Sequence, residues 1–149
     1  MADARDLPKE LCRGVCRALA QRGFATLIEV PLANGRRADV LALGGDGAVA
    51  IVEIKSSVAD FKSDRKWHEY RAYCDRLYFA VASDFPAELI PDDCGLIVAD
   101  PFGAAFLREA TALPLAAARR RVVLLRFARL AAGRLRRVID PGIDDPELG

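Results

Sequence analysis

The apolar positions of this chain fall into short segments whose spacing changes between a helical and a strand period. Leu11, Val15 and Leu19 recur at helical spacing, and Gly23 follows where the end of a helix favours a left-handed residue. Later segments are short apolar runs between turn residues, as in strands, or longer amphipathic runs, as in helices. The pattern predicts helices over residues 7–22, 57–74 and 115–132 and strands over residues 24–32, 38–43, 48–55, 77–82, 95–100 and 104–109.

The order of these segments, α-β-β-β-α-β-β-β-α, predicts an α/β fold with a mixed β-sheet flanked by helices. The first three strands are expected to form a meander, and the fourth to follow a helical crossover. Residues 77–82 and 95–100 are apolar almost throughout, which is typical of parallel strands buried on both faces. We expect a single domain over residues 1–139 and a flexible acidic tail over residues 140–149.

The composition is that of an ordinary globular protein, with 52% hydrophobic residues and 22 Lys and Arg against 21 Asp and Glu. No apolar run approaches the length of a membrane span, and the N-terminus has no signal-peptide character. We therefore expect a cytoplasmic protein with no membrane partner. The cysteines and the single histidine are Cys12, Cys16, Cys74, Cys94 and His68. Their spacing does not match a zinc site and indicates reduced, core-facing thiols.

Charged side chains interrupt the apolar pattern of residues 48–55. Glu53 and Lys55 are two residues apart, so they share one face at the end of a strand that otherwise reads as buried. A charge in such a place is costly to desolvate unless it is paired, hydrated or bound to a metal. The break in the pattern therefore indicates a site at this end of the strand.

Asp39 is the matching exception in the preceding predicted strand. If residues 45–47 form a three-residue hairpin loop with Gly47 in the left-handed conformation, the register sets Asp39 opposite Glu53. A four-residue loop would instead set Val52 opposite Asp39 and separate the two carboxylates. A functional site here thus requires the shorter loop.

Two carboxylates with no cation between them repel each other, and an oxygen-only site of this kind suits Mg²⁺ or Mn²⁺. In metal-assisted phosphodiester hydrolysis, a nearby ammonium such as Lys55 can orient the attacking water and offset charge developing on phosphorus. We therefore assign Asp39, Glu53 and Lys55 as catalytic residues, with Asp39 and Glu53 as metal ligands. Glu29, which interrupts the first strand, is a candidate third ligand or a solvent-facing acid. The alternative for the trio is a buried Lys–carboxylate ion pair.

The tripeptide EIK at residues 53–55, across a hairpin from Asp39 and between two helices, resembles the PD-(D/E)XK nuclease-like superfamily. Ala38 stands where this superfamily often has proline. More narrowly, the chain is similar to the MmcB-type DNA-repair proteins of bacteria. That similarity rests on Glu53-Ile54-Lys55-Ser56-Ser57, Asp60-Phe61, Asp64-Arg65-Lys66-Trp67, Cys74-Asp75 and Gly95-Leu96-Ile97-Val98-Ala99-Asp100. It implies an endonuclease with a restriction-endonuclease-like core, linked to DNA repair, whose activity is inferred largely from its fold.

Lys66-x-x-x-Tyr70 resembles the Gln-x-x-x-Tyr motif of the RecB-like nuclease branch, with lysine in place of glutamine. The two residues lie one helical turn apart and on one face of the predicted second helix, which Ser63 divides in an alternative reading of the pattern. The resemblance implies that both contact phosphate, whereas a salt-bridged, half-buried helix is the alternative. Arg37, beside the predicted catalytic residues, is a further substrate-binding candidate.

Residues 111–139 contain eight arginines and no acid. Such a stripe can follow a phosphate backbone, with each contact adding salt-dependent affinity. Arg119, Arg120 and Arg121 are therefore candidate DNA-binding residues. Because apolar residues are interleaved with the arginines, an amphipathic helix with a solvated basic face is the alternative.

These observations together predict a metal-dependent DNA endonuclease or structure-processing nuclease that hydrolyses phosphodiester bonds in DNA repair. The alternative is a catalytically weak module of the same fold that binds DNA or a repair partner, and a dimerising scaffold is a third interpretation. We expect DNA as the partner, with a homodimer and other DNA-repair proteins as further candidates.

Overall fold

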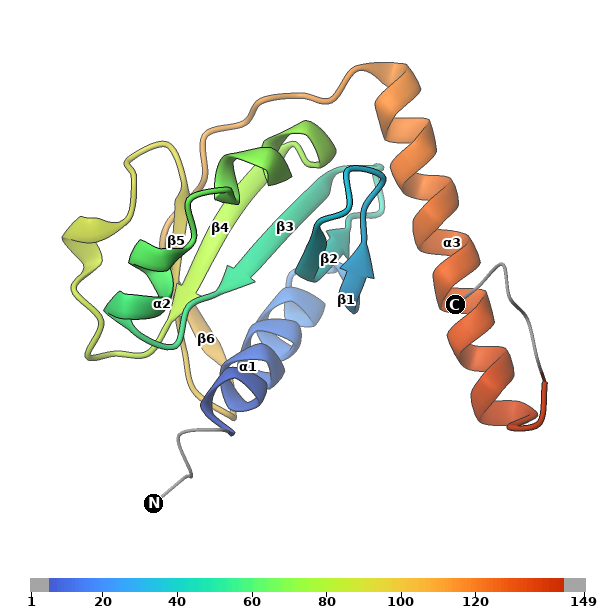
Figure 1. The fold of residues 1–149 in the computed structure, drawn as a ribbon, viewed down its shortest axis with the longest axis horizontal. Helices are drawn as coiled ribbons and strands as arrows, with labels where there is room; N and C mark the ends of the chain where they lie inside the picture. Colours follow the sequence, from blue (N-terminus) through green and yellow to red (C-terminus); the bar gives the residue numbers. More distant parts are fainter. Residues whose placement is uncertain (1–5, 144–149) are drawn as a thin grey trace.

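The computed structural model describes residues 6–143 and shows a six-stranded mixed sheet with helices packed on both faces (Figure 1). This arrangement confirms the predicted α/β fold. In chain order the elements are α1 (Leu7–Gln21), β1 (Ala25–Pro31), β2 (Arg37–Leu43), β3 (Val49–Ile54), α2 (Val58–Ser63), the 3-10 helix η1 (Trp67–Tyr73), β4 (Arg76–Val81), the 3-10 turn η2 (Ala87–Leu89), β5 (Gly95–Ala99), β6 (Ala104–Arg108) and α3 (Ala117–Ile139).

The strands lie side by side in the order in which they occur in the chain, β1 to β6. The strands β1, β2 and β3 form an antiparallel meander, and β4 and β5 continue the sheet in parallel with β3. The strand β6 pairs antiparallel with β5 and forms one edge. The predicted meander and helical crossover are therefore confirmed, and β4 and β5 are buried nearly throughout, as expected for central parallel strands.

The β2–β3 hairpin adopts the register that the three-residue loop predicts. The backbone N–H of Gly44 donates to the Ala48 carbonyl at 2.8 Å, which leaves residues 45–47 as the loop. Gly47 has a φ of 88°, the left-handed conformation that glycine adopts without strain. The observed pairs include Leu43 with Val49 and Leu41 with Ile51.

The sheet separates two apolar clusters. On one face, the buried residues Leu11, Val15 and Leu19 of α1 pack against the even-numbered positions of β3 and their neighbours. On the other face, residues of η1 and α3 cover the odd-numbered positions Val49 and Ile51. Glu53 follows these two in the alternation, so it starts from the face covered by η1.

The predicted second helix is divided into α2 and η1, as the reading with a break at Ser63 allowed. Trp67, Tyr70 and Tyr73 follow the three-residue repeat of a 3-10 helix, and all are buried. Lys66 precedes η1 as its N-terminal flanking residue and is exposed. The expectation that Lys66 and Tyr70 share a helical face is therefore wrong, because residues four apart do not align in this kind of helix.

The last helix, α3, is longer than predicted and runs on to Ile139, along the open edge of β1 (Figure 1). The Arg126 guanidinium donates to the Pro31 carbonyl at 3.1 Å, and Arg134 donates to the Ile28 and Glu29 carbonyls at 2.6 and 2.9 Å. These contacts cover carbonyls of an edge strand that would otherwise be free to pair with another chain.

Within the described part of the chain, no helix combines the length and apolar character of a membrane span. The predicted acidic tail, residues 140–149, falls mostly outside the described residues, which end at Ile143.

Candidate active site

Asp39 and Glu53 meet where the pairing of β2 with β3 ends. The last backbone pair is Val40 with Val52, and beyond it the carboxylates take over the backbone donors. The Asp39 N–H donates to Glu53 Oε2 at 2.9 Å, and the Ile54 N–H donates to Asp39 Oδ2 at 2.8 Å. The two carboxyl groups are also hydrogen-bonded to each other. The predicted proximity of these carboxylates is therefore present in the fold.

Both acids are held in surroundings that disfavour two negative charges. Burial, reinforced by the neighbouring Asp39 charge, raises the pKa of Glu53 to about 8. Burial also raises the pKa of Asp39, although the hydrogen bonds from the Ile54 N–H and from Glu53 partly oppose this. At neutral pH the pair therefore holds a proton between the two carboxyl groups.

The same features suit a hard divalent cation, which would take the place of that proton. The donor atoms of Asp39 and Glu53 are carboxylate oxygens, which Mg²⁺ and Mn²⁺ prefer. Among residues 6–143, no three His, Cys, Asp or Glu side chains gather closely enough to form a metal site by themselves. A cation bound here would thus complete its shell with water, backbone carbonyls or a substrate oxygen, as Mg²⁺ commonly does.

Lys55 belongs to the same strand end but is engaged elsewhere. Its Nζ lies 2.7 Å from Asp64 Oδ2, at the end of α2, and its side chain is only 8% exposed. Burial raises the pKa of Asp64, but the hydrogen bonds from Lys55 and from the Lys66 N–H outweigh burial and lower it. The fold therefore brings Asp39 and Glu53 together, with Lys55 in an ion pair beside them. Its positive charge still lowers the pKa of Asp39.

Tyr70 contacts the site from η1. Its hydroxyl donates to the Arg37 carbonyl at 3.1 Å and is in hydrogen-bond contact with the Glu53 carboxyl group. Burial and the contact with Glu53 raise the pKa of Tyr70, so the phenol stays protonated. The side chains of Arg37 and Lys66, the other predicted phosphate contacts of this region, are exposed.

A cavity of about 620 Å³ opens on the Asp39 side of this cluster. Its lining residues come from α1, from β1 and from the surroundings of Asp39: Pro8, Lys9, Cys12, Arg13, Cys16, Ile28, Glu29, Asp39, Ile54 and Asp60. Glu29 stands opposite Asp39 between the pairs Ile28–Val40 and Val30–Ala38, and it has a φ of 50°. Glu29, the candidate third ligand, is thus exposed and lines the same cavity as Asp39.

Two thiols in this cavity differ from the expectation that all four cysteines face the core. Cys74 and Cys94 are buried as expected, but Cys12 and Cys16 are only partly buried and line the cavity. They are hydrogen-bonded to each other, and this contact is the largest cause that lowers the pKa of Cys16 to about 6. Their spacing of four residues already placed them on one face of α1, but the sequence could not show that this face borders a cavity.

Comparison with known proteins places this chain in a family. A family model described as DNA repair protein MmcB-like matches residues 3–142. This chain belongs to the MmcB-like family of DNA repair proteins. It is also similar to a solved structure described as the SPO1766 protein of unknown function from Silicibacter pomeroyi. That protein is 43% identical, with a TM-score of 0.89 over 93% of this chain and 95% of the other. None of the curated proteins compared with the chain matches it.

The arginines of α3 have different surroundings in this MmcB-like chain. Arg120 forms two 2.7 Å hydrogen bonds with the Asp75 carboxylate. Arg119 lies over the Tyr73 ring, 4.6 Å from its centre. Arg121 is exposed. Of the three arginines predicted to bind DNA, Arg120 therefore holds α3 on the domain.

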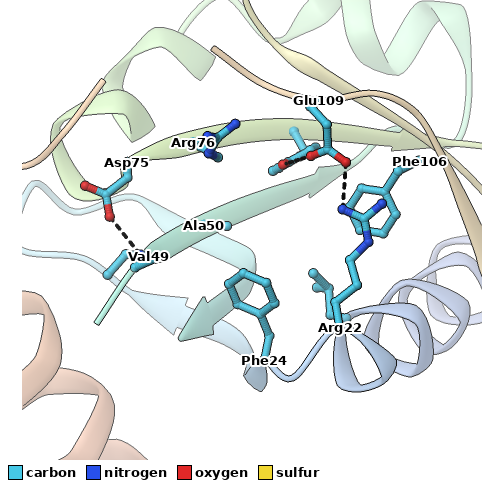
Figure 2. A pocket seen from close by; sticks show the side chains of 11 residues that line it. Arg22, Phe24, Val49, Ala50, Asp75, Arg76, Phe106 and Glu109 are labelled. Atoms are coloured by element: carbon cyan, nitrogen blue, oxygen red, sulfur yellow. Dashed lines mark hydrogen bonds and ion pairs between the residues drawn. The ribbon is translucent and has the colours of Figure 1, made fainter. Parts of the chain in front are cut away.

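A second, smaller cavity of about 150 Å³ lies at the opposite end of β3 (Figure 2). Its polar groups are bonded to one another: Glu109 accepts hydrogen bonds from Arg22 and from Tyr78, each at 2.6 Å. Arg76 donates to the Ala110 carbonyl at 2.6 Å. These contacts connect the end of α1 and strand β4 to the segment that follows β6, so the polar groups of this cavity serve the packing of the MmcB-like domain.

Proposed function

We propose that this chain is a metal-dependent DNA endonuclease or structure-processing nuclease of the PD-(D/E)XK superfamily that hydrolyses phosphodiester bonds during DNA repair. The observation that carries the proposal is the contact between the Asp39 and Glu53 carboxyl groups at the point where two paired strands separate. Membership of a DNA-repair family supports DNA as the substrate.

Each residue has a definite part in this mechanism. Asp39 and Glu53, with Glu29 as a candidate third ligand, would hold Mg²⁺ or Mn²⁺. When bound there, the cation supplies Lewis-acid polarisation of the phosphate and a more acidic water. Tyr70 keeps the Glu53 carboxyl group in place by hydrogen bonding. Lys55 supplies an ammonium that can orient the water once it moves from Asp64 towards the substrate.

The second candidate is a DNA-binding or partner-binding repair module of the same fold with weak catalysis. The ion pair between Lys55 and Asp64 favours it, because an ammonium held by a carboxylate is not free to act on a phosphate. The two candidates differ in what they require of the metal. A nuclease needs the cation for turnover, whereas a binding module binds DNA without it.

The deciding experiment incubates the protein with supercoiled, linear, flapped and branched DNA, with and without Mn²⁺. We expect Mn²⁺-dependent cleavage by the wild type and none by Glu53→Gln, which keeps the shape of the side chain and removes its charge. Equal binding by both proteins with no cleavage by either would support the binding module. The oligomeric state measured by light scattering would test the predicted homodimer in the same samples.

A further inference from the structure

Several arginine side chains of this protein form hydrogen bonds within the fold. On α3, Arg120 forms hydrogen bonds with Asp75, and Arg126 and Arg134 donate hydrogen bonds to backbone carbonyls of β1. Binding DNA through these guanidinium groups would require breaking contacts that hold the helix on the domain. The phosphate-binding surface of the candidate site therefore has to be sought among other cations.

Lys9 and Arg13 differ from these arginines because their charged groups are not engaged within the described part of the fold. They lie one turn apart on α1, both are exposed, and both line the cavity that contains Asp39. In the part of the chain that the structure describes, neither forms a hydrogen bond or an ion pair. Their spacing of four residues places both charges on the same face of the helix.

The helix that carries these two cations is fixed in place, because α1 packs tightly on the domain. Leu11, Val15 and Leu19 are each at most 1% exposed beneath the sheet. A Cβ atom at Gly14 would overlap the carbonyl oxygens of Asp100 and Gly103, so the helix backbone lies directly against that turn. A cation on a fixed helix loses less conformational freedom on binding than one on a loop.

The acids and the cations of the cavity come from different elements. Glu29, Asp39 and Asp60 belong to β1, β2 and α2, whereas Lys9 and Arg13 belong to α1. A phosphate entering alone would be repelled by three carboxylates, but one that approaches a cation held at Asp39 would also be attracted by the charges of Lys9 and Arg13. Cys12 and Cys16 lie on α1 with the two cations and line the same cavity.

We propose that Lys9 and Arg13 bind the phosphate backbone of DNA, so that the scissile phosphodiester reaches Asp39 through this cavity. The assignment rests on the proposed nuclease site and adds to it the element that presents the substrate. It places DNA against α1 and leaves Arg120, Arg126 and Arg134 of α3 as structural groups.

The native thiols provide a direct geometric test. A duplex carrying a bromoacetamide group tethered to one backbone phosphorothioate should alkylate Cys12 or Cys16, because both line the cavity. Cys74 and Cys94 are buried and serve as internal controls. The incubation contains Ca²⁺, a hard cation like Mg²⁺, to favour binding. Adducts on Cys12 or Cys16 that disappear in the Cys12→Ala/Cys16→Ala variant support the assignment. DNA binding without such adducts overturns it.

A charge comparison tests the contacts themselves. The Lys9→Ala/Arg13→Ala variant should bind DNA about tenfold more weakly and lower the slope of log affinity against log salt by about two. Arg136→Ala/Arg137→Ala, which removes the same charge from the exposed last turn of α3, is the matched control. Equal losses in both variants, or no loss in the first, overturn the assignment.

The same variants separate this assignment from the nuclease proposal. Mn²⁺ titration without DNA should give the wild-type affinity in Lys9→Ala/Arg13→Ala, because neither residue is a proposed ligand. Wild-type cleavage with an unchanged salt slope in that variant refutes only the role of α1. If the wild-type protein neither binds Mn²⁺ nor cleaves DNA, the nuclease proposal is refuted. The cross-links and the salt slopes then still decide where DNA binds.

Discussion

The backbone N–H of Asp39 donates a 2.9 Å hydrogen bond to Oε2 of Glu53, a residue 14 positions further along the chain. This bond takes the place of a backbone pair at the end of the β2–β3 ladder. The Glu53 side chain therefore closes the hairpin and contributes to the candidate metal site at once. Stability, protonation and metal binding at this point are expected to depend on one another.

The affinity for Mn²⁺ should rise with pH. Because burial raises the pKa of Glu53 to about 8 from an ordinary value of 4.5, the metal-free protein binds a proton there at neutral pH. The cation must displace that proton, so its affinity increases as the pH approaches 8 and levels off above it. Calorimetric titrations between about pH 6 and pH 9 measure this directly. Glu53→Gln should bind no Mn²⁺ at any of these pH values and keep its circular dichroism spectrum, and a pH-independent wild-type affinity would contradict the prediction.

Replacing Tyr70 by Phe should shift the rise in Mn²⁺ affinity to higher pH. The hydrogen bond from Tyr70 lowers the pKa of Glu53, so its loss raises that pKa further and weakens Mn²⁺ binding at neutral pH. The substitution also leaves the Arg37 carbonyl without its partner, which costs about 1 kcal/mol of unfolding free energy. Calorimetry at several pH values and urea unfolding separate the two effects. Tyr73→Phe, in the same helix, is the control, and an unshifted pH profile in Tyr70→Phe would show that the hydroxyl does not act on Glu53.

Lys55→Ala should destabilise the protein in addition to any effect on cleavage. The Lys55 and Asp64 side chains are 8% and 19% exposed and 2.7 Å apart, so the substitution leaves a partly buried carboxylate unpaired. Removal of one partner from such a pair costs about 3 kcal/mol. The double variant Lys55→Met/Asp64→Asn removes both charges and should recover most of this loss in urea unfolding. A single variant as stable as the wild type would mean that the ion pair is not formed in solution.

Arg120→Ala should lower stability and leave the salt dependence of DNA binding unchanged. The hydrogen bonds from Arg120 are the largest cause that lowers the pKa of Asp75 to about 2 from an ordinary 3.8. Since this folded-state pKa is depressed, the stabilisation is complete above pH 3.8 and disappears as the pH falls towards 2. The variant should lose about 2 kcal/mol at neutral pH and unfold at a higher pH on acid titration.

Arg121→Ala is the neighbouring control, because Arg121 is exposed and its loss should change stability little. A weaker salt dependence of DNA binding in Arg120→Ala would instead show that Arg120 contacts the phosphates of DNA.

Local chemistry explains what the sequence by itself determined. The spacing of Leu11, Val15 and Leu19 predicted α1, and the left-handed requirement at Gly47 selected the three-residue loop. Once that loop is formed, the two-residue period of a strand leaves only one partner for Asp39, so the proximity to Glu53 followed from the hairpin. These relationships lie within about one hairpin of the chain, where sequence spacing restricts the geometry.

The tertiary structure alone decided which partner each charge has. Lys55 pairs with Asp64 because α2 ends beside β3, and Arg120 pairs with Asp75 although they are 45 residues apart. The partly buried Cys12 and Cys16 face a cavity because α1 leaves space beside Asp39. Sequence periodicity specifies which face of a helix or strand a residue occupies, but not which other element lies against that face. That depends on how distant apolar surfaces pack, and the packing places these polar groups near their partners.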